Sequence, residues 1–185
     1  MIQEEFKFYK PCKLLQPYVR YYWVFSSNQM LNTYTFPIGC PQIIFHKRTP
    51  LFVPELDTMQ DKLTISGQVN FSSHLQADND IEMIVVVFYP HTINMFLNTP
   101  ASAFYNKEIS AYDIEENHLN ELAFQVFECE DNKLCVNLIE KWLLSRLSTR
   151  PYDTTYRVNR MNAAIEDSTL KTRTATTKPS VSTTT

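Results

Sequence analysis

Glycine is nearly absent from this sequence. Only Gly39 and Gly67 occur in 185 residues, and they stand far apart. A phosphate-binding P-loop and a Rossmann dinucleotide fingerprint each need several glycines close together, because the backbone must approach the phosphates. The sequence therefore excludes both motifs. It also lacks the Gly-x-Ser-x-Gly turn that presents the nucleophile of α/β-hydrolases.

Cysteine, positive charge and long apolar runs are scarce as well. No two of the four cysteines form a Cys-x-x-Cys pair, so we expect no zinc ribbon and reduced, mostly buried thiols. A formal net charge of −3 argues against a free-standing nucleic-acid binder. The first ten residues do not resemble a secretory signal, and the apolar run 81–90 is too short to cross a bilayer. We therefore expect a cytoplasmic protein with no membrane partner.

The first half of the chain consists of short alternating segments. In residues 20–27, Tyr21, Trp23 and Phe25 share one face, as in a half-buried strand. Residues 81–90 are β-branched and apolar on both faces, which predicts a central strand. Several short strands at regular spacing are typical of an antiparallel barrel or sandwich. The further predicted strands lie in residues 33–37, 42–47, 51–54, 62–67 and 72–77.

The run from Phe36 to His46 predicts a corner between two of these strands. Pro37 and Pro41 cannot donate to a ladder, which suits a bend or a sheet edge. Gly39 between them indicates a backbone angle that other residues resist.

The second half is helical. Asn117 is a predicted N-cap, followed by an apolar stripe up to residue 128. Residues 131–148 form the clearest helix, with Asp131 near its start and Arg146 near its end, as the helix dipole favours. The predicted class is α+β: a cupin-like antiparallel β-barrel or sandwich over residues 1–110, then an α-helical hairpin over 111–150.

Four histidines raise the question of a metal inside the barrel. Cupin-type sites typically use two histidines one residue apart on a strand, and no two of the four are neighbours here. We expect no metal and no other cofactor. His46 is then predicted to be a hydrogen-bonded residue inside the barrel or a residue at its rim. The alternative is a metal site assembled from distant strands.

Aromatic residues of the strands have two interpretations. They are either ordinary core or the wall of an apolar pocket, since small barrels can hold one small ligand. The predicted pocket residues are Trp23, Phe25, Phe36, Phe45, His46 and Phe88.

The helix over 131–148 is ambiguous in a similar way. Its wide apolar face predicts either packing against the barrel or a contact with a second copy, and Trp142 is a residue type often found at interface centres. The predicted dimer-interface residues are Leu134, Leu138, Ile139, Trp142 and Leu143.

The order of several short motifs is more specific than any one of them. The motif residues are Pro11, Leu15, Tyr18, Val19, Tyr22 and Trp23; Pro37, Gly39, Ile44 and Phe45; Ser66, Gly67 and Gln68; Phe88, Tyr89 and Pro90; and Pro100, Phe104 and Asn106. In this order they resemble the sensor domain of one subgroup of AraC-type bacterial transcription regulators over residues 8–148. Ile38 stands where that subgroup often has a polar residue.

The resemblance implies a module, not an enzyme, that senses a small-molecule effector, forms a homodimer and controls DNA binding by a C-terminal helix-turn-helix domain missing from this chain. Residues 151–168 are expected to be a linker and the first helix of that domain, around Arg157–Asp167. Residues 169–185 are threonine-rich and are expected to be a disordered tail. The alternatives are a cupin-type metalloenzyme and a non-catalytic small-molecule-binding barrel.

Overall fold

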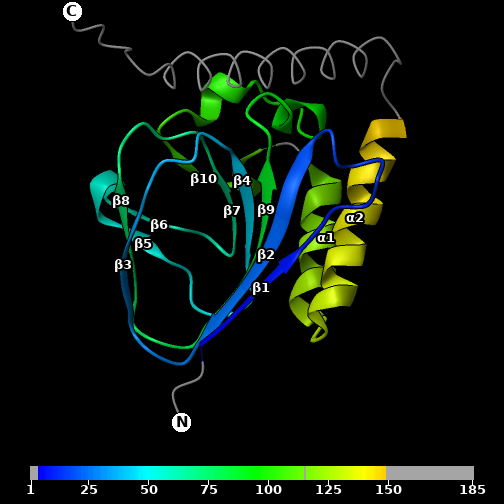
Figure 1. The fold of residues 1–185 in the computed structure, drawn as a ribbon. Helices are drawn as coiled ribbons and strands as arrows, with labels where there is room; N and C mark the ends of the chain where they lie inside the picture. Colours follow the sequence, from blue (N-terminus) through cyan, green and yellow to red (C-terminus); the bar gives the residue numbers. More distant parts are fainter. Residues whose placement is uncertain (1–3, 115, 149–185) are drawn as a thin grey trace, which may run out of the picture. The chain divides into compact units, whose positions relative to one another are not determined.

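The β-branched run predicted to be central becomes the third strand of a six-stranded antiparallel sheet (Figure 1). In this computed structural model, which describes residues 4–114 and 116–148, the sheet order is β1-β2-β9-β4-β7-β10. The strands are β1 (Glu4–Tyr9), β2 (Val19–Ser27), β4 (Gln42–His46), β7 (Leu63–Ser66), β9 (Ile81–Phe88) and β10 (Glu108–Ser110).

A smaller sheet of four strands has the order β3-β8-β5-β6. At one end the chain crosses twice from one sheet to the other: β2 continues into β3, and β8 continues into β9. Ser27 pairs with Ile81 in the larger sheet and Leu31 pairs with Ala77 in the smaller one. The bounds are β3 (Leu31–Thr35), β5 (Phe52–Val53), β6 (Thr58–Met59) and β8 (Ser73–Ala77).

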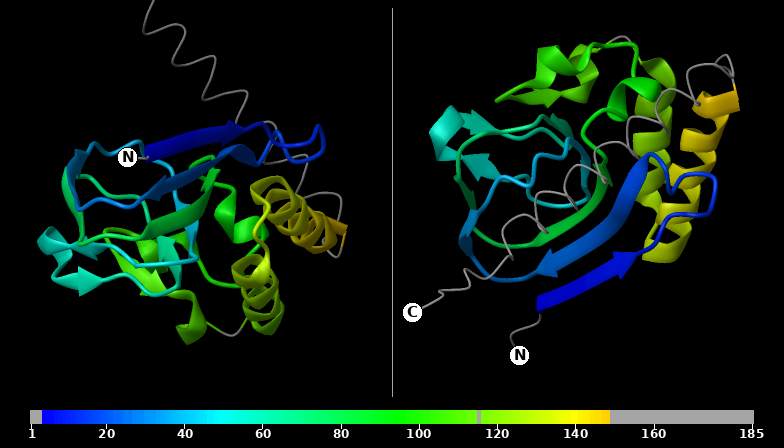
Figure 2. Two further views of the ribbon diagram at one scale, coloured as in Figure 1. Left: turned by 90° about the horizontal axis from the view of Figure 1, so that it is seen from below. Right: turned by 45° about the horizontal axis from the view of Figure 1, so that its top comes forward.

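The larger sheet lies between the smaller sheet and the helices (Figures 1 and 2). Its inner face turns to the smaller sheet and contributes Phe25, Ile44 and Val85 to a core that includes Leu51. Its outer face carries Tyr22, Ile84, Val86, Phe45 and Phe88, all buried. The outer core continues into the segment after β9, where the ring of Phe88 lies 5.4 Å from that of Phe96.

Of the two predicted arrangements, barrel or sandwich, the structure is a sandwich. The two sheets face each other, but within the described residues every strand pair belongs to one sheet or the other, so no closed barrel forms. Two strands of the smaller sheet, β5 and β6, are only two residues long, and β5 pairs with β8 at a single position. A sheet with such short strands offers too few ladder bonds to close onto its neighbour.

Two helices form the predicted hairpin, α1 (Asn117–Glu128) and α2 (Asn132–Ser148). Asp131 caps α2, since its carboxylate accepts the N–H of Leu134 at 2.8 Å. At the start of α1 the N-cap position belongs to Glu116, one residue before the predicted Asn117. Short 3-10 helices connect the elements: η1 (Pro54–Leu56), η2 (Ile93–Met95), η3 (Ala101–Phe104) and η4 (Ala111–Asp113).

The corner predicted around Gly39 is confirmed. Gly39 adopts a left-handed φ of 66°, and a Cβ at this position would meet nothing within 4 Å. The carbonyl of Pro41 accepts the N–H of Phe88, which attaches the corner to β9. The predicted linker, the helix around Arg157–Asp167 and the threonine-rich tail lie outside the described residues.

Candidate functional site

The inner face of the larger sheet changes character from one edge to the other. At the β1–β2 edge it is aromatic, and Phe6 stacks on Trp23 with ring centroids 5.0 Å apart. In the middle, β9 and β4 supply aliphatic side chains such as Val85 and Ile44. At the β7–β10 edge it becomes polar, where Ser66 lies opposite Glu108. One face thus offers both apolar and hydrogen-bonding surface.

A chain of hydrogen bonds runs across the polar end. The imidazole Nε2 of His46 lies 2.8 Å from Oε1 of Gln60, and Nε2 of Gln60 donates to Oε2 of Glu108 at 3.1 Å. The hydroxyl of Ser66 donates to the other carboxyl oxygen of Glu108 at 2.8 Å. His46, Gln60 and Ser66 are all buried. These four side chains, His46, Gln60, Ser66 and Glu108, are called the polar chain below.

The donor order within the polar chain fixes the state of His46. Because Gln60 donates through its amide nitrogen to Glu108, its amide oxygen faces His46 and must accept a hydrogen bond from it. Nε2 of His46 therefore carries the hydrogen, and Nδ1 is a bare acceptor. His46 is 0% exposed and its Nδ1 has no hydrogen-bond partner among the described residues. A buried acceptor of this kind is completed by an O–H or N–H donor.

Burial shifts the two ionisable groups of the polar chain in opposite directions. Desolvation lowers the pKa of His46 to about 4, against a smaller opposing effect of its hydrogen bond to Gln60. Desolvation raises the pKa of Glu108 to about 7, although the hydrogen bonds from Ser66 and Gln60 favour the carboxylate. Near neutral pH the imidazole is therefore neutral, and Glu108 changes charge in the physiological range.

The raised pKa of Glu108 predicts a pH-dependent stability difference. An unfolded glutamate titrates near 4.5, so the folded state binds more protons than the unfolded state between pH 4.5 and 7. The contribution of Glu108 is complete below pH 4.5 and is lost as the pH rises to 7. We expect the unfolding free energy of the wild type, relative to Glu108→Gln, to fall by about 2–3 kcal/mol over this range in urea titrations.

Both proteins in this comparison contain His46, so its opposite slope between pH 4 and 6.5 cancels in the difference. Glu121, whose side chain is 70% exposed, supplies the matched control. Glu121→Gln removes an exposed carboxylate and controls for the loss of one negative charge in the same titrations. A pH-independent difference for Glu108→Gln would contradict the assignment.

The structure divides the predicted pocket residues between two sheet faces. Trp23, Phe25 and His46 lie on the inner face, where His46 pairs with Met83 and Met83 with Phe25. Phe45 and Phe88 point to the helices, because neighbouring residues of a strand alternate between faces. Phe36 lies in the corner and is 75% exposed. The structure therefore does not bring the six together on one face, because Phe36, Phe45 and Phe88 lie away from the inner face.

The predicted interface residues of α2 also separate. Ile139 and Leu143 are buried within the chain and Trp142 is 8% exposed, while Leu134 is 57% exposed. Leu138 and Trp142 line a groove of about 420 Å³ together with residues of both helices. The apolar positions of α2 are thus spread over more than one side of the helix. Its role as a dimer contact stays a prediction.

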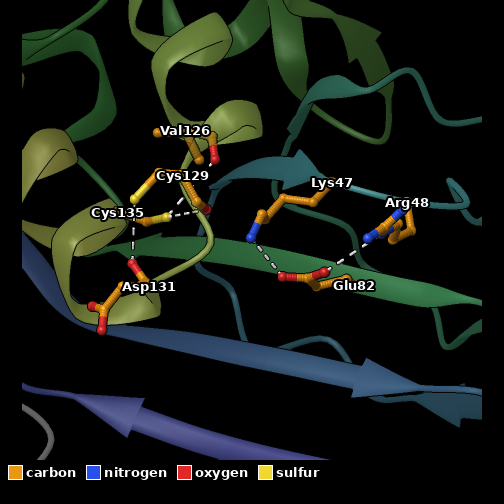
Figure 3. A network of polar contacts seen from close by, with 7 residues as sticks. All are labelled: Lys47, Arg48, Glu82, Val126, Cys129, Asp131 and Cys135. Carbon is orange, nitrogen blue, oxygen red and sulfur yellow. Dashed lines mark hydrogen bonds and ion pairs between the residues drawn. The ribbon is translucent and has the colours of Figure 1, made fainter.

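A second polar network lies on the outer face, where β4 ends (Figure 3). Nζ of Lys47 lies 2.6 Å from Glu82, whose other oxygen lies 3.7 Å from Nε of Arg48. These residues line a cleft of about 400 Å³ with Phe127, Glu128 and Glu130 of the α1 end. The Lys47 side chain is only 6% exposed, so its pairing with Glu82 offsets the cost of burying an ammonium. We assign this network to the packing of sheet against helices.

The thiols beside this cleft are held as hydrogen-bond donors. Sγ of Cys135 lies 3.2 Å from the carbonyl of Cys129, and Sγ of Cys129 lies 3.4 Å from that of Asp131 (Figure 3). Burial, and then the Cys129 thiol, raise the pKa of Cys135 to about 12, which keeps it protonated and unreactive at neutral pH. All four cysteines are free, with Cys40 and Cys135 buried and Cys12 and Cys129 partly exposed.

Within residues 4–114 and 116–148, no three histidine, cysteine, aspartate or glutamate side chains gather closely enough to hold a metal ion. In the same residues, every helix is too short or too polar to span a membrane.

Comparison with known proteins gives one match. A family model described as a domain of unknown function (DUF6597) matches residues 7–110. No curated protein and no solved structure matches the chain. The matched range contains nearly all of both sheets and every residue of the polar chain, and it ends before α1. Since it spans more than half of the sequence, the chain belongs to the DUF6597 family, whose members share this domain of unknown function.

Proposed function

We propose that this protein is the sensor and dimerisation module of an AraC-type transcription regulator, and that its effector binds at the inner face of the larger sheet. The observation that supports this most is the polar chain. His46, Gln60, Ser66 and Glu108 form a hydrogen-bonded group in which the first three are buried and Nδ1 of His46 has no partner among the described residues. Keeping such a group in a core costs stability, because an unpaired buried polar atom loses its water without replacement.

The chemistry of the inner face describes the effector. The aromatic edge suits a flat apolar body, and Nδ1 of His46 requires an O–H or N–H donor on the ligand. Glu108, with its pKa near 7, accepts a hydrogen bond as a carboxylate or donates one as an acid. A small aromatic or aliphatic compound with a hydroxyl or amino group fits these requirements.

Regulation would then follow from linkage. An effector that binds one arrangement of sheet and helices more tightly shifts the population toward it, and so changes how two DNA-binding domains are held. The order of motifs that resembles AraC-type sensors supports this role. The DNA-binding half would be supplied outside the residues that resemble the sensor domain.

A thermal-shift screen of small hydroxylated and aminated compounds tests the sensing role. At a concentration 100 times its Kd, an effector stabilises the folded state by about 2.7 kcal/mol, which raises the melting temperature by roughly 8 °C. The shift should disappear in His46→Phe and remain in Leu134→Ala, which changes an exposed residue of α2.

Circular dichroism of His46→Phe confirms that the variant folds before its binding is compared. Glu108→Gln serves as a second variant, since it keeps the size of the side chain and should weaken binding without removing it. If no compound class raises the melting temperature, the sensing role is wrong. If shifts survive in His46→Phe, the effector binds elsewhere.

A further inference from the structure

β1 ends the larger sheet and, among the described residues, pairs on one side only (Figures 1 and 2). All six of its residues pair with β2 in an uninterrupted register, whereas the neighbouring β2–β9 ladder contains a register shift. Natural sheet edges are usually blunted by prolines, bulges or charged side chains, and β1 carries three charged residues, of which Glu4 lies on the inner face. β1 has no proline and no bulge, so its free backbone groups form a regular row that another strand can join.

On β1, Phe6 and Phe8 share the inner face with Glu4, and Glu5, Lys7 and Tyr9 lie on the outer face. Phe6 and Phe8 extend the inner face and are 55% and 65% exposed. Glu5 and Lys7 lie on the outer face, where they form an ion pair with each other. Two exposed phenylalanines on an unpaired edge strand are the kind of surface that marks an interaction site.

The charge order of β1 makes the strand complementary to itself. In an antiparallel pair with Phe6 opposite Phe6 of a second copy, Glu5 lies opposite Lys7 of that copy, and Lys7 lies opposite its Glu5. On the inner face the same register places Phe8 opposite Glu4 of the other copy. Moving the centre of the pairing by one residue would place Lys7 opposite Lys7. Only pairings centred on a residue, rather than between two residues, keep the inner faces of both copies on the same side of the sheet, because side chains alternate with a period of two.

We propose that β1 is a self-association surface, which pairs antiparallel with β1 of a second copy of this chain in the register centred on Phe6. The two six-stranded sheets then join into one sheet across a two-fold axis. Phe6 of each copy packs against its equivalent, and two Glu5–Lys7 pairs close the other face. This assigns a surface to the self-association in the proposed function, but it depends on the geometry of β1 alone.

The comparison with α2 favours β1. On α2, Ile139 and Leu143 are already buried within the chain, and Leu134 is exposed without a neighbouring apolar residue of similar exposure on that helix. On β1, five of six residues are exposed, and they offer backbone groups as well as side chains.

A charge exchange at Glu5 and Lys7 tests the pairing by sedimentation velocity. Glu5→Lys alone places lysines opposite lysines, and Lys7→Glu alone places glutamates opposite glutamates. Each single variant should raise the dimer Kd roughly tenfold or more, since two attractive pairs become repulsive. The double variant Glu5→Lys/Lys7→Glu restores both pairs and should dimerise like the wild type. An equimolar mixture of the two single variants should form the heterodimer.

Leu134→Glu is the matched control. It introduces a charge at an exposed position of α2 and should leave the dimer Kd unchanged. A wild type that stays monomeric at several hundred micromolar would overturn the proposal. So would single variants that dimerise normally, or a mixture that forms no heterodimer. Sedimentation reports only association, whereas the effector is detected by melting shifts, so the two proposals fail separately. Unchanged melting temperatures of the single variants confirm that the fold is intact.

Discussion

Replacing Gly67 with alanine is expected to lower the melting temperature by roughly 10 °C, which corresponds to about 3 kcal/mol of unfolding free energy. A Cβ at this position would lie 1.6 Å from the carbonyl oxygen of Phe104 and 2.4 Å from its carbonyl carbon. The obstacle is backbone, which cannot rotate away as a side chain can. The N–H of Gly67 also donates to the carbonyl of Lys107, which fixes the two segments against each other.

Gly39 provides the matched control, because its reason for being glycine is different. Its φ of 66° costs an alanine about 1 kcal/mol, but a Cβ would meet nothing within 4 Å. Gly39→Ala should therefore lower the melting temperature by only a few degrees, and Gly39→Asn by less. Differential scanning calorimetry of the three variants decides the matter. Equal effects at Gly67 and Gly39 would refute the close approach of residue 67 to Phe104.

Arg146→Ala is expected to lower the unfolding free energy by about 3 kcal/mol or more. Nη2 of Arg146 lies 2.9 Å from Oε1 of Glu116, which is only 4% exposed, and its Nε donates to the carbonyl of Phe96 at 3.1 Å. The substitution leaves the Glu116 carboxylate buried without its guanidinium. It also breaks the contact between α2 and the segment after β9. Urea denaturation measures the loss.

The double variant Arg146→Met/Glu116→Gln separates charge from packing. It removes both charges together, so it should recover part of the stability that Arg146→Ala loses. His118→Ala is the exposed control: its side chain is 73% exposed and lies 3.4 Å from Glu121, a pair that should contribute almost nothing. An Arg146→Ala protein that unfolds at the wild-type urea concentration would contradict the role of the ion pair.

The strongly patterned elements could be predicted from the sequence. The β-branched run of β9 fixed its central position, since a strand buried on both faces cannot lie at a sheet edge. The corner at Gly39 followed from its flanking prolines, and α2 followed from its apolar face and from Asp131 at its start. Each of these signals is local and is read from consecutive residues.

β1 was missed although its signal is present. Phe6 and Phe8 alternate with Glu5 and Lys7, the pattern of a strand with one apolar face, but the segment is short and lies at the very start of the chain. The choice between a barrel and a sandwich could not be made from the sequence, because the length of β5 and β6 depends on tertiary pairing. The sequence around them shows apolar residues but not how few of them form a ladder.

The polar chain shows the limit of reading residues one by one. His46 was singled out, but Gln60 comes from the connection before β7, Ser66 ends β7, and Glu108 begins a strand three residues long. They meet because the sheet order places β10 beside β7 and β7 beside β4. No spacing in the sequence encodes that order. The alternation of side chains along a strand places Phe45 and His46 on opposite faces of the sheet, so these two predicted pocket residues could be separated from the sequence.

The position of β9 has a consequence for how this protein loses its structure. The smaller sheet and the helices pack on opposite faces of the larger sheet, and seven of the eight residues of β9 are buried, with members on both faces. If either layer melts, it exposes one side of β9 to water and weakens the ladders that the other layer needs. The two layers are therefore joined into one cooperative folding unit, with β9 as the link between them.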